Sequence, residues 1–411
     1  MAWPEENPSS SKIARGKIRI SEEWSKAAVS ITFGSQDSPQ PTVLVCGPKN
    51  SGKSTFSRHL LNVLLQKYKK VAFLDTDIGQ TEFTPPGVLS LCIIDKPTPD
   101  LEIICMKTPE RTTNDLHVMD HMLYLKGVFK DLSCNLFFIA VIRCYFFGDV
   151  SSSRDPGKYL QCVYALYDYY RDELCKSENS KSSMVELPLI VNTPGWIKGS
   201  GYEVLVKMLN YVSLTHVVKL RSYNDSKDLP RGAFWCDNGC NHSTLLEIKA
   251  VIDCATCPLT LQKIAALFRE IKMIAYFRQC IPSGSNLNRN KVLARALAAL
   301  PPYEVPISSI KVRHLHCQVP SSEVFYSLNA SIVGLGISSE KSPDIHLCVG
   351  LGIVRGIDLF KGLLYVITPV PLRILEKVDI LLQGFIQIPQ GFLQAQGCVS
   401  PYSATDVLPI C

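Results

Sequence analysis

Residues 47–54 read Gly47-Pro48-Lys49-Asn50-Ser51-Gly52-Lys53-Ser54 and match the pattern G-x-x-x-x-G-K-[ST] at every fixed position. The apolar run Thr42–Cys46 comes directly before them, and apolar residues at helical spacing follow from Phe56. A strand, a glycine-rich loop and a helix in this order are typical of a phosphate-binding loop. In such a loop, backbone N–H groups and the positive helix end surround phosphate oxygens. The stretch therefore predicts a site for a nucleoside triphosphate, and a chance glycine-rich turn is the minor alternative.

The side chains of this loop have separate predicted roles. We expect Lys53 to reach the β- and γ-phosphates and the Ser54 hydroxyl to ligate Mg²⁺. Thr55 continues the loop into the helix. The residues predicted to bind ATP are Gly47, Pro48, Lys49, Asn50, Ser51, Gly52, Lys53, Ser54 and Thr55.

Two carboxylates end the next apolar run of the chain. Val71–Leu74 predicts a second buried strand, and Asp75 and Asp77 follow it, about 22–24 residues after Lys53. Carboxylates at this strand end face the phosphate loop, where they can hold Mg²⁺ or accept a proton from a hydroxyl group. Capping of a following helix is the alternative. A guanine-specific switch protein would carry D-x-x-G here. The residue three positions before Gly79 is Thr76 and not Asp, which argues against that class.

Further apolar runs alternate with helical patterns along the chain. Leu136–Phe147, Leu187–Val191 and Val217–Leu220 predict buried strands, and Tyr159–Tyr170 has helical spacing. This alternation predicts an α/β fold of the P-loop NTPase type, with a parallel sheet and helices on both faces. Later apolar runs separated by Gly and Pro predict a smaller β-rich domain. The predicted division is a basic, loosely ordered N-terminus at 1–38, a P-loop domain at 39–285 and a C-terminal β-rich domain at 286–411.

The composition excludes several classes of protein. Of 411 residues, 46% are hydrophobic and 19% charged, which is enough for a large core and unlike a disordered chain. The net charge of +6 is mild, so only its distribution can indicate a polyanionic partner. The 16 cysteines are spread thinly and no apolar leader is present, which favours reduced thiols inside the cell. No apolar run reaches the roughly 18 residues that cross a bilayer, so we expect no membrane association.

Several longer runs go beyond a generic nucleotide site. Residues 77–87 read Asp77-Ile78-Gly79-Gln80-Thr81-Glu82-Phe83-Thr84-Pro85-Pro86-Gly87, and residues 155–159 read Asp155-Pro156-Gly157-Lys158-Tyr159. Residues 192–202 read Asn192-Thr193-Pro194-Gly195-Trp196-Ile197-Lys198-Gly199-Ser200-Gly201-Tyr202. Together they closely resemble the polynucleotide 5′-hydroxyl kinases of RNA-end processing, in which the third run is similar to the "clasp". Residues 81–87 resemble the nucleolar branch of that family, and the similarity covers roughly residues 40–280.

The resemblance implies a kinase that transfers the γ-phosphate of ATP, with Mg²⁺, to the 5′-hydroxyl end of RNA. It implies a role in pre-rRNA processing and ribosome biogenesis, in the nucleus and nucleolus, with a nuclease or RNA-processing complex as partner. In this scheme Asp77 would orient or deprotonate the 5′-hydroxyl, and Asp75 would be its partner at the metal.

The resemblance also implies residues that hold the RNA end. They are Gln80, Thr193, Gly195 and Trp196, with the indole of Trp196 stacking on a base of any sequence. Without the family, core packing would be the better interpretation of Trp196.

A basic lid helix is a further implication of the resemblance. Between Lys263 and Arg295, seven basic residues face one acidic residue, Glu270, an excess equal to that of the whole chain. Arg269 and Lys272 share one face of the predicted helix and are the candidates for reaching the γ-phosphate. A solvated basic face is the alternative. The seven basic residues are Lys263, Arg269, Lys272, Arg278, Arg289, Lys291 and Arg295.

Two other hypotheses stay open at this point. The spacing of Cys236, Cys240, Cys254 and Cys257 is acceptable for a structural zinc, although scattered free thiols are the interpretation that we favour. The second is an ATP-binding assembly or scaffold factor of an RNA-processing complex, without kinase turnover. Loss of Asp77 or of a stacking aromatic side chain would favour that class, and the sequence retains both.

Overall fold

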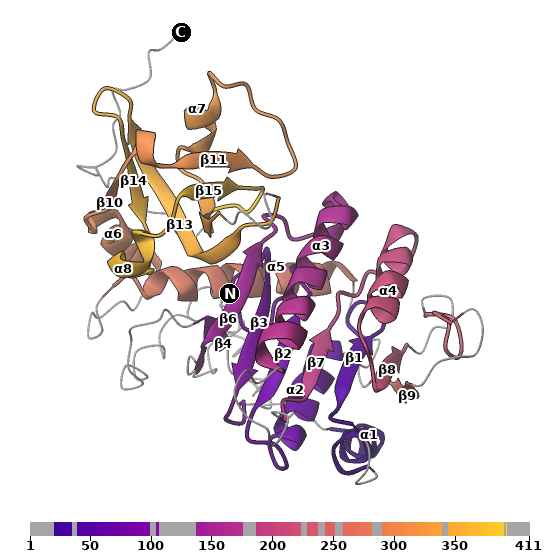
Figure 1. Ribbon diagram of the computed structural model, residues 1–411. Helices are drawn as coiled ribbons and strands as arrows, with labels where there is room; N and C mark the ends of the chain where they lie inside the picture. The colour runs from indigo at the N-terminus through magenta and orange to yellow at the C-terminus, as the bar shows by residue number, and fades with distance from the viewer. Residues whose placement is uncertain are drawn as a thin grey trace, which may run out of the picture.

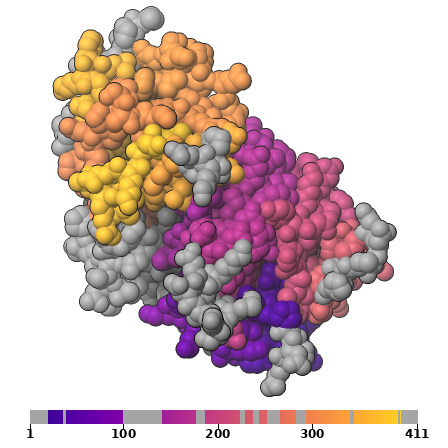
Figure 2. Space-filling model, in the orientation of Figure 1, coloured from indigo at the N-terminus to yellow at the C-terminus, as the bar shows by residue number. Residues whose placement is uncertain are grey.

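The computed structural model describes residues 20–34, 39–98, 104–106, 137–175, 186–222, 228–236, 243–250, 258–281, 290–338, 344–389 and 392. Within them, thirteen strands form one sheet and two more form a separate pair. Figure 1 shows the β-rich C-terminal part, in orange and yellow, next to the P-loop part, in indigo and magenta. In Figure 2 the atoms of the two parts lie directly against each other. None of the described helices is both long and apolar enough to span a membrane.

The P-loop part of the sheet has five parallel strands in the order β2-β7-β1-β8-β9. Their middle members are buried along their length because helices cover both faces of the sheet. This arrangement confirms the predicted α/β class. The strands are β1 (Thr42–Cys46), β2 (Val71–Asp75), β7 (Leu189–Asn192), β8 (His216–Arg221) and β9 (Thr244–Lys249).

Two pairs of helices cover the two faces of these strands (Figure 1). On one face lie α1 (Glu22–Phe33) and α2 (Lys53–Leu64). On the other lie α3 (Pro156–Tyr169), which continues as the π-helical turn η4 (Tyr170–Leu174), and α4 (Ser200–Tyr211). The one-turn helix η3 (Ser152–Arg154) precedes α3.

The sheet is mixed, whereas the sequence predicted a parallel one. β3 (Val88–Ile94) pairs antiparallel with β2, and β6 (Val141–Phe146) pairs antiparallel with β3. A parallel neighbour requires a crossover, usually a helix, and the connection between β2 and β3 contains none, so the chain turns back. The predicted strand Leu136–Phe147 divides in two. Its first part, β5 (Phe137–Ile139), pairs with β4 (Ile104–Met106) outside the main sheet.

The C-terminal part continues the same sheet, as expected of a β-rich region, with strands that pair antiparallel except for the parallel pair β11–β15. Contact with the P-loop part is made where Leu347 pairs with Tyr145 of β6. The strands are β10 (Tyr303–Pro306), β11 (Lys311–His314), β12 (Ile332–Ile337), β13 (Leu347–Asp358), β14 (Leu363–Ile367) and β15 (Ile380–Gln383). The helices are α5 (Pro258–Arg278), α6 (Asn290–Ala299), η6 (Ile307–Ser309), α7 (Val324–Leu328) and α8 (Leu372–Leu375).

Helix α1 corrects one prediction for the N-terminal segment. It lies within residues 1–38, which we expected to be loosely ordered, and that expectation is wrong for Glu22–Phe33. Trp24 is only 2% exposed, and its indole Nε1 donates to the carbonyl oxygen of Lys249 at 2.8 Å. Its ring meets Phe56 of α2 edge to face at 5.5 Å. The predicted boundary at 285/286 stays a prediction, because residues 282–289 lie outside the described residues.

Replacing Trp24 with alanine should destabilise the protein strongly. The change removes a buried indole that touches α2 and β9, and such truncations cost about 3–5 kcal/mol. Urea unfolding of the full chain measures this loss. Val29→Ala, on the same helix at a side chain that is 49% exposed, is the matched control and should change the free energy of unfolding little. A Trp24→Ala loss no larger than that of the control would contradict the packing of α1.

Candidate active site

The phosphate loop runs from the end of β1 to the start of α2. Gly47, Asn50 and Gly52 have positive φ angles of 148°, 61° and 90°. A Cβ atom at Gly47 would lie 2.6 Å from the Leu220 carbonyl oxygen, and one at Gly52 would lie 2.7 Å from the Trp24 ring. Glycine is therefore needed at both positions, for conformation and for space. Trp24 thus contacts the phosphate loop at Gly52 and is also part of the hydrophobic core.

The interior of the loop is suited to an anion. The Lys53 Nζ donates to the Pro48 carbonyl oxygen at 2.8 Å, inside the loop, and its side chain is only 6% exposed. Burial lowers the pKa of Lys53 to about 8, although the nearby Asp77 charge acts in the opposite direction. The Ser51 hydroxyl is buried and has no hydrogen-bond partner in the described part of the chain. A buried cation and an orphaned hydroxyl at a helix N-terminus fit the triphosphate of ATP.

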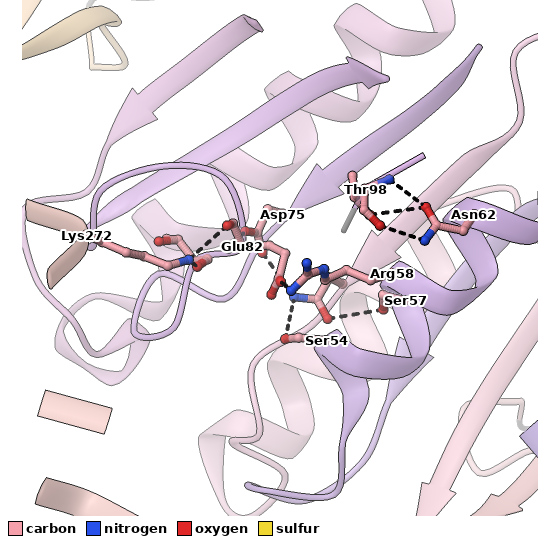
Figure 3. Close-up of polar contacts among 10 residues, drawn as sticks. Ser54, Ser57, Arg58, Asn62, Asp75, Glu82, Thr98 and Lys272 are labelled. Atoms are coloured by element: carbon pink, nitrogen blue, oxygen red, sulfur yellow. Dashed lines mark hydrogen bonds and ion pairs between the residues drawn. The ribbon is translucent and has the colours of Figure 1, made fainter. Parts of the chain in front are cut away.

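Oxygen atoms gather at the Ser54 end of the loop. Asn192 Nδ2 donates to Ser54 Oγ at 3.4 Å and to Asp75 Oδ1 at 3.1 Å (Figure 3). Asp75 is fully buried, and burial raises the pKa of its carboxyl group to about 7. A hydroxyl and one or two carboxylates, completed by phosphate oxygens, are what Mg²⁺ uses at nucleotide sites. The donor set of Ser54, Asp75 and Asp77 is chemically suited to Mg²⁺, and Asn192 bridges Asp75 to Ser54.

Asp77 lies close to two positive charges. Its Oδ1 accepts hydrogen bonds from the N–H groups of Gly79 at 3.2 Å and Gln80 at 3.1 Å. Burial raises the pKa of Asp77, and the Lys53 charge opposes this rise. Burial lowers the pKa of Arg269 on α5, and the charge of Asp77 opposes that change. The charges of Lys53 and Arg269 thus both interact with that of Asp77, while the Gln80 side chain, three residues further on, is exposed.

The clasp residues lie against the phosphate loop. A Cβ atom at Gly195 would be 2.6 Å from the backbone N and Cα of Lys49, so the two backbones touch. The half-buried Trp196 ring packs directly beside Gly201 of α4. The Thr193 hydroxyl is buried and donates to the Val45 carbonyl oxygen at 2.8 Å, which attaches the clasp to β1. Gly195 therefore borders the phosphate loop, the adjacent Trp196 ring packs toward α4, and Thr193 holds this segment against β1.

The two lid candidates have different partners. Arg269 lies near Asp77, but the Lys272 Nζ donates to the backbone carbonyl oxygens of Thr81 and Glu82, the latter at 2.9 Å (Figure 3). The ammonium group of Lys272 is therefore held by the Thr81–Glu82 turn and not directed into the phosphate loop.

Three residues of this site were missed in the sequence. Asn192 ends β7, accepts from Ser57 Oγ at 3.4 Å and bridges Ser54 to Asp75. Glu82 and Arg58 form an ion pair at 3.2 Å. A usable signal existed for Asn192, because polar residues at the carboxyl ends of parallel strands meet at one edge of the sheet.

The zinc hypothesis is not decided by the geometry. Cys236 is a free, partly buried thiol, and Cys240, Cys254 and Cys257 lie outside the described residues. Within the described ranges, no cluster of three or more His, Cys, Asp or Glu side chains could hold a metal ion.

The fold and the site define a P-loop nucleotide-binding protein, and comparison with known proteins gives its family. Residues 47–279 match the family model of the mRNA cleavage and polyadenylation factor CLP1 P-loop, and residues 298–389 match the NOL9-like C-terminal domain. The chain belongs to the polynucleotide 5′-hydroxyl-kinase family of the Clp/Grc type, in its NOL9 branch. The predicted family is therefore confirmed.

Individual relatives agree with this placement. Polynucleotide 5′-hydroxyl-kinase NOL9 of Arabidopsis thaliana is 52% identical over 394 residues, which are 95% of this chain and 96% of that protein. The Danio rerio protein of the same name is 31% identical, over 89% of this chain and 49% of its own length. The chain thus spans nearly all of the plant relative and about half of the fish one. A solved structure of the Clp1p–Pcf11p complex has a similar fold, with a TM-score of 0.59 at 15% identity, covering 89% of this chain and 78% of that one.

Proposed function

We propose that this protein is an ATP-dependent kinase that phosphorylates the 5′-hydroxyl ends of RNA during pre-rRNA processing. The observation that carries the proposal is the buried Lys53 inside a loop that fits a triphosphate, together with the Asp77 carboxylate that follows β2 and is held by the N–H groups of Gly79 and Gln80. Relatives that carry the name polynucleotide 5′-hydroxyl-kinase NOL9 support both the acceptor and a place in the nucleus and nucleolus.

One oxygen of the Asp77 carboxylate remains open to the acceptor. Two backbone N–H groups fix Oδ1, and Oδ2 accepts no hydrogen bond from the described residues. Oδ2 is thus the atom that orients the 5′-hydroxyl and accepts its proton. Burial raises the pKa of Asp77, which makes the carboxylate a better proton acceptor than an exposed one.

The cations act on the phosphate side of the reaction. Lys53 exchanges its bond to the Pro48 carbonyl oxygen for the phosphates, and Arg269 approaches from α5. Together they stabilise negative charge that develops on the transferred group. Ser54 and Asp75, with Asp77, would hold Mg²⁺, which supplies further neutralisation of the phosphates when bound.

The direct experiment uses the full chain, ATP labelled at the γ-position and an oligoribonucleotide with a 5′-hydroxyl end. Label should pass to that RNA and not to the same RNA carrying a 5′-phosphate. A DNA oligonucleotide of equal sequence tests the preference for RNA. ATP binding without any transfer would favour an ATP-dependent assembly factor.

We also propose a nuclease or other RNA-processing partner, in keeping with the Clp1p structure, in which Clp1p is bound to Pcf11p.

Trp196→Ala should weaken binding of the oligonucleotide. Loss of one base–indole stack reduces affinity by about 1–3 kcal/mol, which raises the KM for RNA roughly 5- to 150-fold. ATP binding should be unchanged, because the loop and Lys53 do not depend on the indole. Transfer rates at several oligonucleotide concentrations separate the two effects. An unchanged KM for RNA would assign Trp196 to packing against Gly201 alone.

Removal of Mg²⁺ should stop transfer. A general chelator takes away the ion that Ser54, Asp75 and Asp77 would hold, and added Mg²⁺ should restore the rate. A zinc-selective chelator should leave both the rate and the folded state unchanged. Unfolding in the zinc-selective chelator would instead establish a structural zinc, with Cys236 as a ligand.

A further inference from the structure

Helix α5 makes a polar contact with the P-loop part through Lys272. Ile271 and Ala275 of this helix are buried in a core formed with the C-terminal strands. Lys272 instead extends to the turn after β2, where its ammonium group binds two backbone carbonyl oxygens, those of Thr81 and Glu82 (Figure 3). A charged donor makes stronger hydrogen bonds than a neutral one, so this contact fixes the turn relative to α5.

The same turn is fastened to the site on its other side. The Glu82 N–H donates to Asp75 Oδ2, and the Glu82 carboxylate pairs with Arg58 Nη1 of α2 at 3.2 Å. The two side chains of that pair are only 12% and 15% exposed, so the pair is partly protected from water and from salt. Glu82 therefore links α2, the end of β2 and α5 through three different groups.

From Asp75 the contacts continue to the phosphate loop. Asp75 Oδ1 accepts from Asn192 Nδ2, and the same amide reaches Ser54 Oγ. An unbroken series of hydrogen bonds thus runs from Lys272 on α5 to the residue predicted to ligate Mg²⁺.

We propose that Lys272 is a positioning residue that couples helix α5 to the Ser54–Asp75 end of the phosphate loop through the Thr81–Glu82 turn. This differs from the sequence-based expectation that Lys272 reaches the γ-phosphate, a task that remains with Arg269. To reach a phosphate, Lys272 would have to give up both carbonyl oxygens and release the turn. The activity part of the inference rests on the proposed function, whereas its structural part does not.

The structural test is hydrogen exchange of the full chain without nucleotide. In Lys272→Met, backbone amides of residues 77–87 should exchange roughly tenfold faster or more, because the turn loses its charged anchor. Lys272→Arg keeps the donors and should restore much of the protection. Lys207→Met is the matched control, since it makes the same change at an exposed site on α4, and should leave these amides unchanged. Unchanged exchange in Lys272→Met would overturn the proposal, whether or not the protein is a kinase.

The activity test distinguishes positioning from direct phosphate contact. A positioning role predicts that Lys272→Met lowers kcat roughly 10- to 100-fold and raises the Mg²⁺ concentration for half-maximal rate. Glu82→Gln removes the charge that pairs with Arg58 and so loosens the same turn. The free-energy losses in kcat of the two single variants should therefore add to far more than the loss of the double variant. Additive losses with an unchanged Mg²⁺ requirement would place Lys272 on the phosphate instead. Should Lys272→Met fail to fold, Lys272→Gln, which retains a donor, and Glu82→Gln allow the same measurements.

Discussion

Lys53→Ala should nearly abolish phosphate transfer. Lys53 is the buried cation inside the loop, and removal of one preorganised electrostatic contact in an active site typically costs about 3–4 kcal/mol, a few hundredfold in rate. Transfer of labelled phosphate to a 5′-hydroxyl oligoribonucleotide measures the loss. Lys70→Ala is a matched control, because this exposed lysine precedes β2 at the opposite edge of the sheet. More than about a tenth of the wild-type rate in Lys53→Ala would contradict the assignment of the loop.

Asp77→Asn should remove transfer while ATP binding persists. The substitution keeps the shape of the side chain and an oxygen for the N–H groups of Gly79 and Gln80, but removes the charge that accepts the hydroxyl proton. Loss of a positioned general base lowers rates by roughly 10²–10⁴-fold, and less where the transition state is loose. ATP-binding titrations together with transfer rates separate the two steps.

A second carboxylate provides the control for this variant. Asp95 is exposed and follows β3, which is antiparallel to β2, so it lies at the edge of the sheet away from the site. Asp95→Asn should therefore transfer phosphate at the wild-type rate. If Asp77→Asn also does so, Asp77 is not the base.

The parts of the site that the sequence predicted are those encoded in short contiguous runs. Residues 47–54 specify a loop whose positive φ angles and helix start are local properties. Asp75 and Asp77 follow directly from the end of a buried strand. The parallel direction of the central strands could also be predicted from the sequence, because helical segments separate β1, β2 and β7 and make crossover connections necessary.

The parts that were not predicted depend on contacts between distant segments. β3 was not among the predicted strands, and the antiparallel direction of β6 was hidden because a buried apolar run looks the same in either orientation. Asn192 meets Ser54 and Asp75 across more than a hundred residues, and Lys272 meets Glu82 across 190. Polar residues dominate the start of the chain, which concealed the buried positions of α1, Trp24 among them.

The burial of α5 against the C-terminal strands has a consequence for shortened forms of the protein. Tyr276 accepts a hydrogen bond from the Leu351 N–H at 2.8 Å, and its neighbour Phe277 is fully buried in the same core. A chain that stopped after residue 281 would keep the phosphate loop, Asp75 and Asp77, yet α5 would lose the C-terminal strands that it packs against and Arg269 would lose its fixed position. It would also leave the edge of β6 open to pairing with other chains, which promotes aggregation. Late frameshift alleles should therefore be as inactive as alleles that destroy the ATP site.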